Sequence, residues 1–185
     1  MANVVLTLTR SGQKATPATD PKSTQLIGEW GKLAFMSDGK LVDTYDTLER
    51  RNGNADPKKE FVFLPKGNYL IVPNLSQKVG LYWIHKYSSK LDFNSLWPQF
   101  LNDGGTPDDA SDDTYAPSAS PKVREILLHP ATNPFELEGC IAPGRKATAG
   151  SLLIGSGERA LVAMLTAIGK GPGKLVVIND PAIGK

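Results

Sequence analysis

Cysteine, histidine and long apolar runs are the scarce features of this 185-residue chain. Cys140 is the single cysteine, so an intrachain disulfide is excluded and any thiol chemistry has to use this residue. No apolar run approaches the roughly 18 residues of a membrane-spanning helix, so no membrane span is expected. The opening residues, MANVVLTLTR, lack the charged and apolar regions of a secretory signal, and no signal peptide is expected.

A strong charge of either sign is also absent. The chain has 21 basic and 19 acidic residues, a net charge of +2, and its lysines and arginines are scattered. A nucleic-acid-binding domain usually has a clustered basic face, so nucleic acid is not expected as a partner. The hydrophobic fraction of 40% and the length suit one β-rich domain spanning residues 1–185.

Most of the segments with a recognisable secondary-structure pattern are short runs of β-favouring residues. They lie at 3–10, on both sides of Asp38-Gly39 within 31–49, at 61–74 with a bend at 65–67, at 79–89, at 123–129 and at 174–180. An Asp-Gly pair between apolar runs is typical of a tight hairpin. These runs predict several short strands.

One helix is expected near the C-terminus. Its apolar positions follow the i, i+3, i+4, i+7 spacing of a helix face: Leu161, Met164, Leu165 and Ile168. Ser156 is the expected N-cap, and Gly169 is the expected stop. Together the strands and this helix predict an α+β, β-rich fold with a mixed or antiparallel sheet, or a partial barrel, and one C-terminal amphipathic helix.

Residues 102–121, NDGGTPDDASDDTYAPSASP, have no apolar periodicity. We expect an inserted acidic surface loop or lid there. Its five aspartates do not follow the order of a calcium-binding EF-hand, so no metal is expected in this segment.

The stretch ILLHPATNPFELEGC, residues 126–140, contains His129 and Cys140. A cysteine nucleophile needs a nearby base and backbone N–H donors for the developing oxyanion, and this stretch offers a histidine at a strand end and a glycine before the cysteine. Two other interpretations stay open. In the first, His129 and Cys140 are ordinary half-buried side chains. In the second, His85, His129 and Cys140 are ligands of a zinc ion.

Four segments carry a family resemblance. TLER (47–50), LPKGNYLI (64–71), ILLHPATNPFELEGCI (126–141) and GSGERALVAMLTAI (155–168) follow in the order found in an uncharacterised domain family of phage genomes and bacterial secretion clusters. The His…Glu-Gly-Cys stretch is similar to that of the L,D-transpeptidases of peptidoglycan. The resemblance covers about residues 3–168, and the His-to-Cys stretch is its most specific part.

The resemblance implies catalytic roles for Cys140 as nucleophile, His129 as general base and then acid, and Gly139 through its N–H at the oxyanion. It implies substrate-binding roles for Asn133, Glu138 and Arg145. The substrates would be peptidoglycan stem peptides, with no cofactor and no metal. Other phage virion or tail proteins are expected partners, and the expected location is the virion or the host cytoplasm, with action at the bacterial cell wall.

The transpeptidase pattern S-x-G-C-x-R is only partly kept. Leu137 stands where the pattern has a hydroxyl, and Ala142 stands where it has an arginine, with Arg145 expected to take the place of that arginine. Two functions therefore follow from the sequence. One is a cysteine-dependent peptidoglycan enzyme, acting by acyl transfer or hydrolysis; the other is a non-catalytic virion structural or wall-binding component of the same fold.

Overall fold

The computed structural model describes residues 3–16, 28–50, 64, 66–74, 95–102, 114–115, 127–137, 140–169, 173–179 and 182. The predicted strand at 79–89, including His85, lies outside these residues. So do Glu138, Gly139 and residues 123–126 of another predicted strand.

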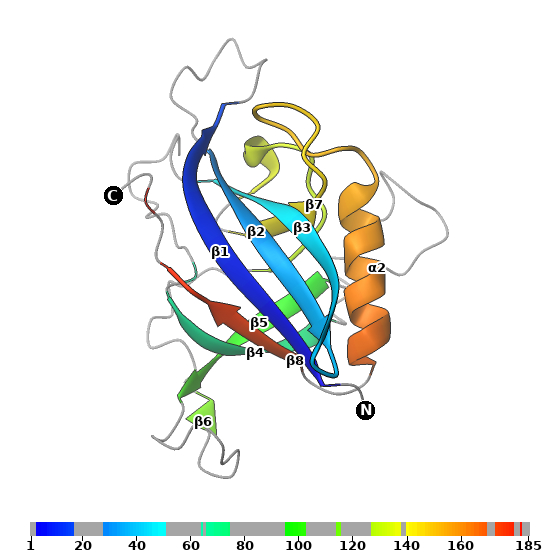
Figure 1. The fold of residues 1–185 in the computed structure, drawn as a ribbon. Helices are drawn as coiled ribbons and strands as arrows, with labels where there is room; N and C mark the ends of the chain where they lie inside the picture. The colour runs from blue at the N-terminus through cyan, green and yellow to red at the C-terminus, as the bar shows by residue number, and fades with distance from the viewer. Residues whose placement is uncertain are drawn as a thin grey trace.

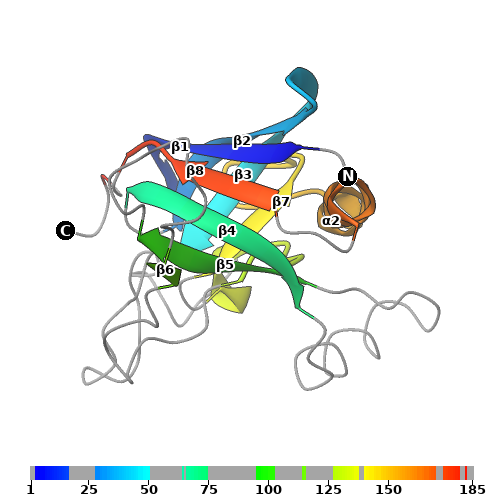
Figure 2. The ribbon, with the colours of Figure 1, turned by 90° about the horizontal axis from the view of Figure 1, so that it is seen from below.

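The strands form a mixed sheet. They are β1 (Val4–Ala15), β2 (Gly28–Ser37), β3 (Lys40–Arg50), β4 (Gly67–Asn74), β5 (Ser95–Asn102), β6 (Thr114–Tyr115), β7 (Ile141–Gly144) and β8 (Gly173–Val177). Their order is β6-β5-β4-β8-β1-β2-β3-β7. Only the β1–β8 pair among the described strands is parallel. No pairing of these strands joins β6 to β7, so the sheet is open, and it curls strongly (Figures 1 and 2).

The strand-rich α+β class predicted from the sequence is confirmed. The hairpin at Asp38-Gly39 is also confirmed, because β2 and β3 pair on both sides of it. Asp38 has a φ of 49° and Gly39 a φ of 74°, the two positive values that the tight hairpin turn requires. Since aspartate and glycine adopt such values most readily, the local sequence accounts for this turn.

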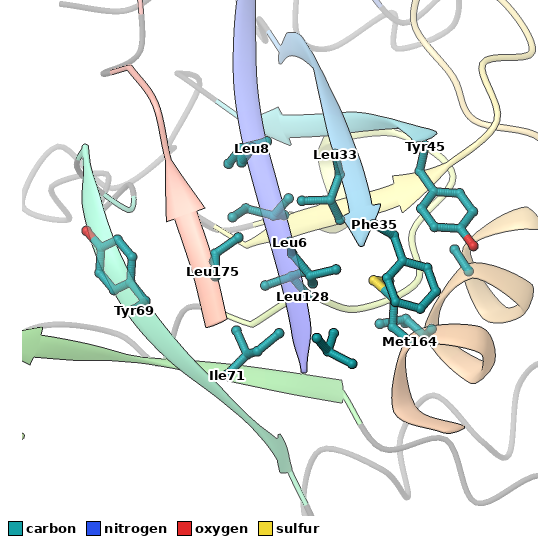
Figure 3. Packing of buried hydrophobic residues seen from close by; sticks show 14 of the residues in the cluster. Leu6, Leu8, Leu33, Phe35, Tyr45, Tyr69, Ile71, Leu128, Met164 and Leu175 are labelled. Carbon is teal, nitrogen blue, oxygen red and sulfur yellow. The ribbon is translucent and has the colours of Figure 1, made fainter. Parts of the chain in front are cut away.

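The two faces of the sheet bury different sets of side chains. We call the face that carries Leu6, Leu33 and Phe35 the inner face, and the face that carries Trp30, Leu48 and Ala142 the outer face. The inner face packs into one cluster with side chains from β1, β2, β4, β8 and α2, shown in Figure 3. Each large apolar side chain buried there contributes about 1.5–3 kcal/mol to folding.

Helix α2 (Ser156–Ile168) covers the inner cluster with Ala160, Leu161, Met164 and Ile168. Its end at Gly169 is as predicted, with a φ of 61° at that glycine. The predicted N-cap is wrong, because Gly155 is the cap and Ser156 is the first helical residue. The Ser156 hydroxyl instead donates to the Leu153 carbonyl at 2.6 Å and accepts from the Arg145 N–H at 2.9 Å. This serine therefore joins the helix to β7.

The sequence patterns missed three strands. β5 and β7 were not predicted, and β6 falls inside the segment predicted as an acidic loop. Asn102 belongs to β5, and Thr114 and Tyr115 pair with that strand, so a wholly irregular insertion is wrong at these three residues. Residues 103–113 and 116–121 lie outside the described part of the chain. β6 and β7 have too few residues to show a periodic pattern, and β5 contains Pro98, which weakens a strand signal.

The inner face ends in a buried ion pair. Arg10 donates through Nε to Glu49 Oε2 at 2.8 Å and through Nη2 to Glu49 Oε1 at 3.0 Å, and both side chains are at most 1% exposed. The same guanidinium donates to the carbonyls of Leu64 at 2.7 Å and Asn179 at 2.6 Å. It therefore joins β1 and β3 to the chain before β4 and the chain after β8.

Candidate functional site

The candidate site lies on the outer face, beside the last strand of the sheet. Residues 127–129 run parallel to the start of β7, with Leu128 bridged to Ile141. The His129 N–H donates to the Ile141 carbonyl at 3.1 Å, and the Ile141 N–H donates to the Leu127 carbonyl at 2.9 Å. The predicted strand at 123–129 is thus described only at its last three residues, where it is reduced to a single isolated bridge at Leu128.

Alternation along the two segments decides which side chains share a face. Leu128 and Ile141 belong to the inner cluster, while Leu127 and Cys140 belong to the outer one. Because alternate residues of a strand lie on the same face, His129 shares the outer face with Leu127 and Cys140. The register places Cys140 next to Leu127 and His129 diagonally across, with Cβ atoms of such diagonal neighbours about 7 Å apart. This separation is within reach of an imidazole side chain.

Cys140 is a free thiol with an exposed fraction of 9%. It lies in an apolar cluster made up of Ala15, Trp30, Leu48, Leu127, Ala131, Leu137, Ala142 and Leu152. The Leu127 N–H is directed at its sulfur, with a distance of 3.4 Å from N to Sγ. A hydrogen bond of this kind stabilises a thiolate more than a thiol, because it is strongest with the charged form.

His129 is held by its own following residue. Its Nδ1 lies 2.8 Å from the Pro130 carbonyl oxygen. A carbonyl oxygen only accepts, so Nδ1 carries the proton in this bond. In the neutral imidazole the lone pair is then on Nε2, which is the arrangement of a general base.

Burial lowers the pKa of His129 below its ordinary value of 6.5. The Pro130 carbonyl and the charge of Glu136 act in the opposite direction, and burial outweighs both. The lowered pKa favours the neutral imidazole at pH 7.

The loop between His129 and Cys140 is fixed by its own hydrogen bonds. Asn133 precedes the single-turn helix η1 (Pro134–Glu136) and caps it, with Oδ1 accepting from the Phe135 N–H at 2.9 Å. Asn133 Nδ2 and Thr132 Oγ1 each donate to Glu136 Oε1 at 2.6 Å. Asn133, predicted to bind substrate, therefore has a cap role in the loop.

Arg145 lies at the opposite end of β7 from Cys140. Five residues of extended chain separate the two, about 16 Å at the usual rise of a strand. Its guanidinium is bonded to both carboxylate oxygens of Asp43, at 2.7 and 2.6 Å, and to the Thr44 carbonyl at 2.6 Å. These bonds hold the pKa of Asp43 below its ordinary value. The structure thus does not bring Arg145 to the cysteine.

The two positions at which the transpeptidase pattern is broken are both core positions here. Leu137 and Ala142 are each 0% exposed and belong to the outer cluster. The structure describes neither Glu138 nor Gly139, so their predicted roles stay predictions. His85 is likewise outside the described residues. Among those that are described, no group of three or more His, Cys, Asp and Glu side chains is arranged to hold a metal ion.

Arg50 is a residue of this site that the sequence patterns did not single out. It is the last residue of β3, and the pairing of β3 with β7 sets Glu49 opposite Ile141. Arg50 follows Glu49 and, because strand side chains alternate between faces, it shares the outer face with Leu48. Arg50 is the last residue of the TLER segment, but only the strand pairing shows that Gly28 of β2 lies opposite it.

No family model, no curated protein and no solved structure matches this chain. Within the part of the chain that the structure describes, no helix is long and apolar enough to cross a membrane.

Proposed function

We propose that the chain is a cysteine-dependent acyl-transfer enzyme that acts on the peptide stems of peptidoglycan. One observation carries the reaction type: Cys140 and His129 lie on the same face in adjacent strand segments, and the proton on His129 Nδ1 leaves Nε2 as the accepting nitrogen. The choice of peptidoglycan rests on the likeness of residues 126–141 to the L,D-transpeptidases.

The reaction would proceed through a thioester. His129 Nε2 takes the proton of the Cys140 thiol, and the sulfur attacks a peptide carbonyl carbon to form a C–S bond. The oxyanion collapses, the C–N bond breaks, and the proton on Nε2 passes to the leaving amine. Attack by water then gives hydrolysis, and attack by the amine of a second stem gives a new crosslink. The Pro130 carbonyl keeps the imidazole in the required tautomer throughout.

The surrounding biology follows from the same resemblance. We infer action at the bacterial cell wall, from a virion or from the host cytoplasm, with other virion or tail proteins as partners. A stem peptide is recognised through its amide and carboxylate groups, so no cofactor enters the proposed reaction.

Turnover of defined stem peptides tests this function. Purified protein would be incubated with muropeptides that carry tetrapeptide stems, and the products separated by mass. We expect Cys140→Ala to abolish turnover and His129→Ala to lower it by roughly 10²–10⁴-fold, the usual contribution of a positioned base. Arg159→Met, an exposed substitution on α2, is the matched control and should leave turnover unchanged. Equal turnover by wild type and Cys140→Ala would exclude the proposal.

The second candidate is a non-catalytic wall-binding or virion structural component. The observation that favours it is the burial of Cys140 among apolar side chains, together with Leu137 and Ala142 at the two altered positions. This candidate predicts that the protein binds sacculi without cleaving them, and that Cys140 reacts with iodoacetamide at the same rate in wild type and His129→Ala.

A further inference from the structure

The two reactive side chains of the candidate site are covered. Cys140 and His129 are each only 9% exposed, and Cys140 is a member of the outer cluster, which also contains Trp30 and Leu152. Acyl transfer requires a peptide carbonyl carbon about 3–3.5 Å from the sulfur. Part of the cover of the outer cluster therefore has to move before a peptide reaches the thiol.

Residues 146–152 form a turn whose base is closed. The Leu153 N–H donates to the Arg145 carbonyl at 2.7 Å. The Ser156 hydroxyl bonds both chains at the same place, because it accepts from the Arg145 N–H at 2.9 Å and donates to the Leu153 carbonyl at 2.6 Å. The turn is thus able to move as one unit on a base that is attached to α2.

Contacts to β2 and to the loop before β7 hold this turn in place. The Trp30 Nε1–H donates to the Ala149 carbonyl at 2.9 Å, and Lys146 Nζ lies 4.7 Å from the centre of the Trp30 ring. The Leu152 N–H donates to the Thr132 carbonyl at 2.7 Å. Trp30 belongs to β2 and Thr132 to the loop between the two reactive residues, so the turn is attached on two sides of the outer cluster.

The side chains under the turn continue toward the thiol. Trp30 pairs with Leu48 and Leu48 with Ala142, so a row of outer-face side chains runs from β2 to β7. Cys140 is two residues before Ala142 and shares its face, about 7 Å away along an extended chain. Movement of the turn away from Trp30 would therefore expose the cluster in which the thiol is buried.

Resting on the acyl-transfer function proposed above, we propose that residues 146–152 are a lid that opens to admit the peptide to Cys140, and that Trp30 holds the lid closed. Gly150 and Leu152 are the buried residues of this segment, and the other five are exposed or half-buried. A segment with so few buried apolar contacts opens at low cost. The loop before β7 is fixed by the cap and carboxylate bonds described above, and it stays in place.

Alkylation of Cys140 by iodoacetamide under native conditions measures the opening. Trp30→Phe keeps an aromatic ring and removes the N–H donor, so the rate constant should rise about fivefold, the usual net contribution of one hydrogen bond. Lys146→Met removes the cation over the ring and should raise the rate constant about threefold. Loss of a nearby positive charge by itself makes a thiol less reactive, so an increase identifies opening of the lid.

Lys174→Met is the matched control for the charge. Lys174 is an exposed lysine of β8, and it lies on the outer face because its neighbour Leu175 lies on the inner one. This variant should alkylate at the wild-type rate. Low concentrations of urea separate the two routes to the thiol: opening of seven residues exposes little surface and should leave the rate flat, whereas global unfolding would raise it steeply.

Two results would overturn the lid. One is an alkylation rate that is the same in wild type, Trp30→Phe and Lys146→Met. The other is a Cys140 that reacts only with the steep urea dependence of global unfolding.

Turnover of stem peptides separates this inference from the function on which it rests. Turnover that needs Cys140, with alkylation rates that ignore Trp30 and Lys146, would overturn the lid and keep the function. Faster alkylation in Trp30→Phe and Lys146→Met, with equal turnover by wild type and Cys140→Ala, would keep the lid and exclude the function.

Discussion

Glu49 and Arg50 are adjacent in the chain but lie on opposite faces of the sheet. Glu49 is 1% exposed and pairs with Arg10, whose guanidinium also bonds two backbone carbonyls. Arg50 lies on the other face, which also carries Leu48. Arg10 and Glu49 on the inner face bond to fixed partners from distant segments, which suits a structural role. The outer face carries the Cys140 thiol and the His129 imidazole on adjacent segments of the chain.

Removing the inner ion pair should give the largest loss of stability. In Glu49→Gln the Arg10 guanidinium stays buried without its carboxylate, so we expect the free energy of unfolding to fall by about 3–5 kcal/mol. Urea unfolding monitored by circular dichroism measures it. If Glu49→Gln lowers the free energy of unfolding by no more than the loss of an exposed ion pair does, water reaches the Arg10 guanidinium and the prediction is wrong.

The pH dependence of stability reports on the outer face. Burial lowers the pKa of His129 in the folded protein, so below about pH 6.5 the unfolded chain binds a proton that the folded chain does not. The free energy of unfolding should therefore decrease as pH falls from 7.5 to 5.5, by at most about 1.4 kcal/mol per pH unit from this residue. His129→Gln should flatten the profile by that amount. Identical slopes in the two proteins would contradict the burial of a neutral imidazole.

Thr47 offers a smaller test on the inner face. Its hydroxyl oxygen is the buried side-chain polar atom without a hydrogen-bond partner among the described residues. Replacing it by the similar shape of valine removes a desolvated group, so Thr47→Val should raise the free energy of unfolding by about 1 kcal/mol. Chemical denaturation at pH 7 measures this, and a loss of stability would mean that the hydroxyl is bonded in solution.

The exposed Asp43–Arg145 pair should have the smallest effect. The two side chains are 33% and 49% exposed, so Asp43→Asn should lower the free energy of unfolding by less than about 1 kcal/mol. The Arg145 hydrogen bonds hold the pKa of Asp43 below its ordinary value. The contribution of this ion pair to the free energy of unfolding is therefore present above about pH 4, and it is lost as pH falls through the pKa of Asp43 in the folded protein. The free energies of unfolding of wild type and Asp43→Asn, measured at pH 7 and at pH 3, test this. A difference between the two proteins that is larger at pH 3 than at pH 7 would contradict the prediction.

Elements with strong local patterns were predictable from the sequence. The β2–β3 hairpin follows from Asp38-Gly39 between apolar runs, and the end of α2 follows from Gly169. The N-cap of α2 was not predictable, because Ser156 is bonded to Leu153 and to the Arg145 N–H, which lie outside the helix. β7 was missed because four residues with a proline and a glycine carry no periodic signal.

The sequence pointed to a candidate reactive pair but did not assign the roles of the residues around it. Spacing alone pointed to His129 and Cys140 as a candidate pair. It also favoured Asn133 and Arg145, since both are near in sequence, and the structure shows Asn133 as a cap and Arg145 bonded to Asp43.

The sequence by itself determined the β-rich class, the amphipathic helix, the tight hairpin and the presence of one thiol with a histidine eleven positions before it. These follow from local rules, in which alternation, helical spacing and turn residues act over a few positions. Tertiary structure alone decided that Glu49 is buried against Arg10 while Arg50 lies on the opposite face of the sheet. Strand register is a long-range property, and because side chains alternate between faces, a shift of one residue would exchange the two.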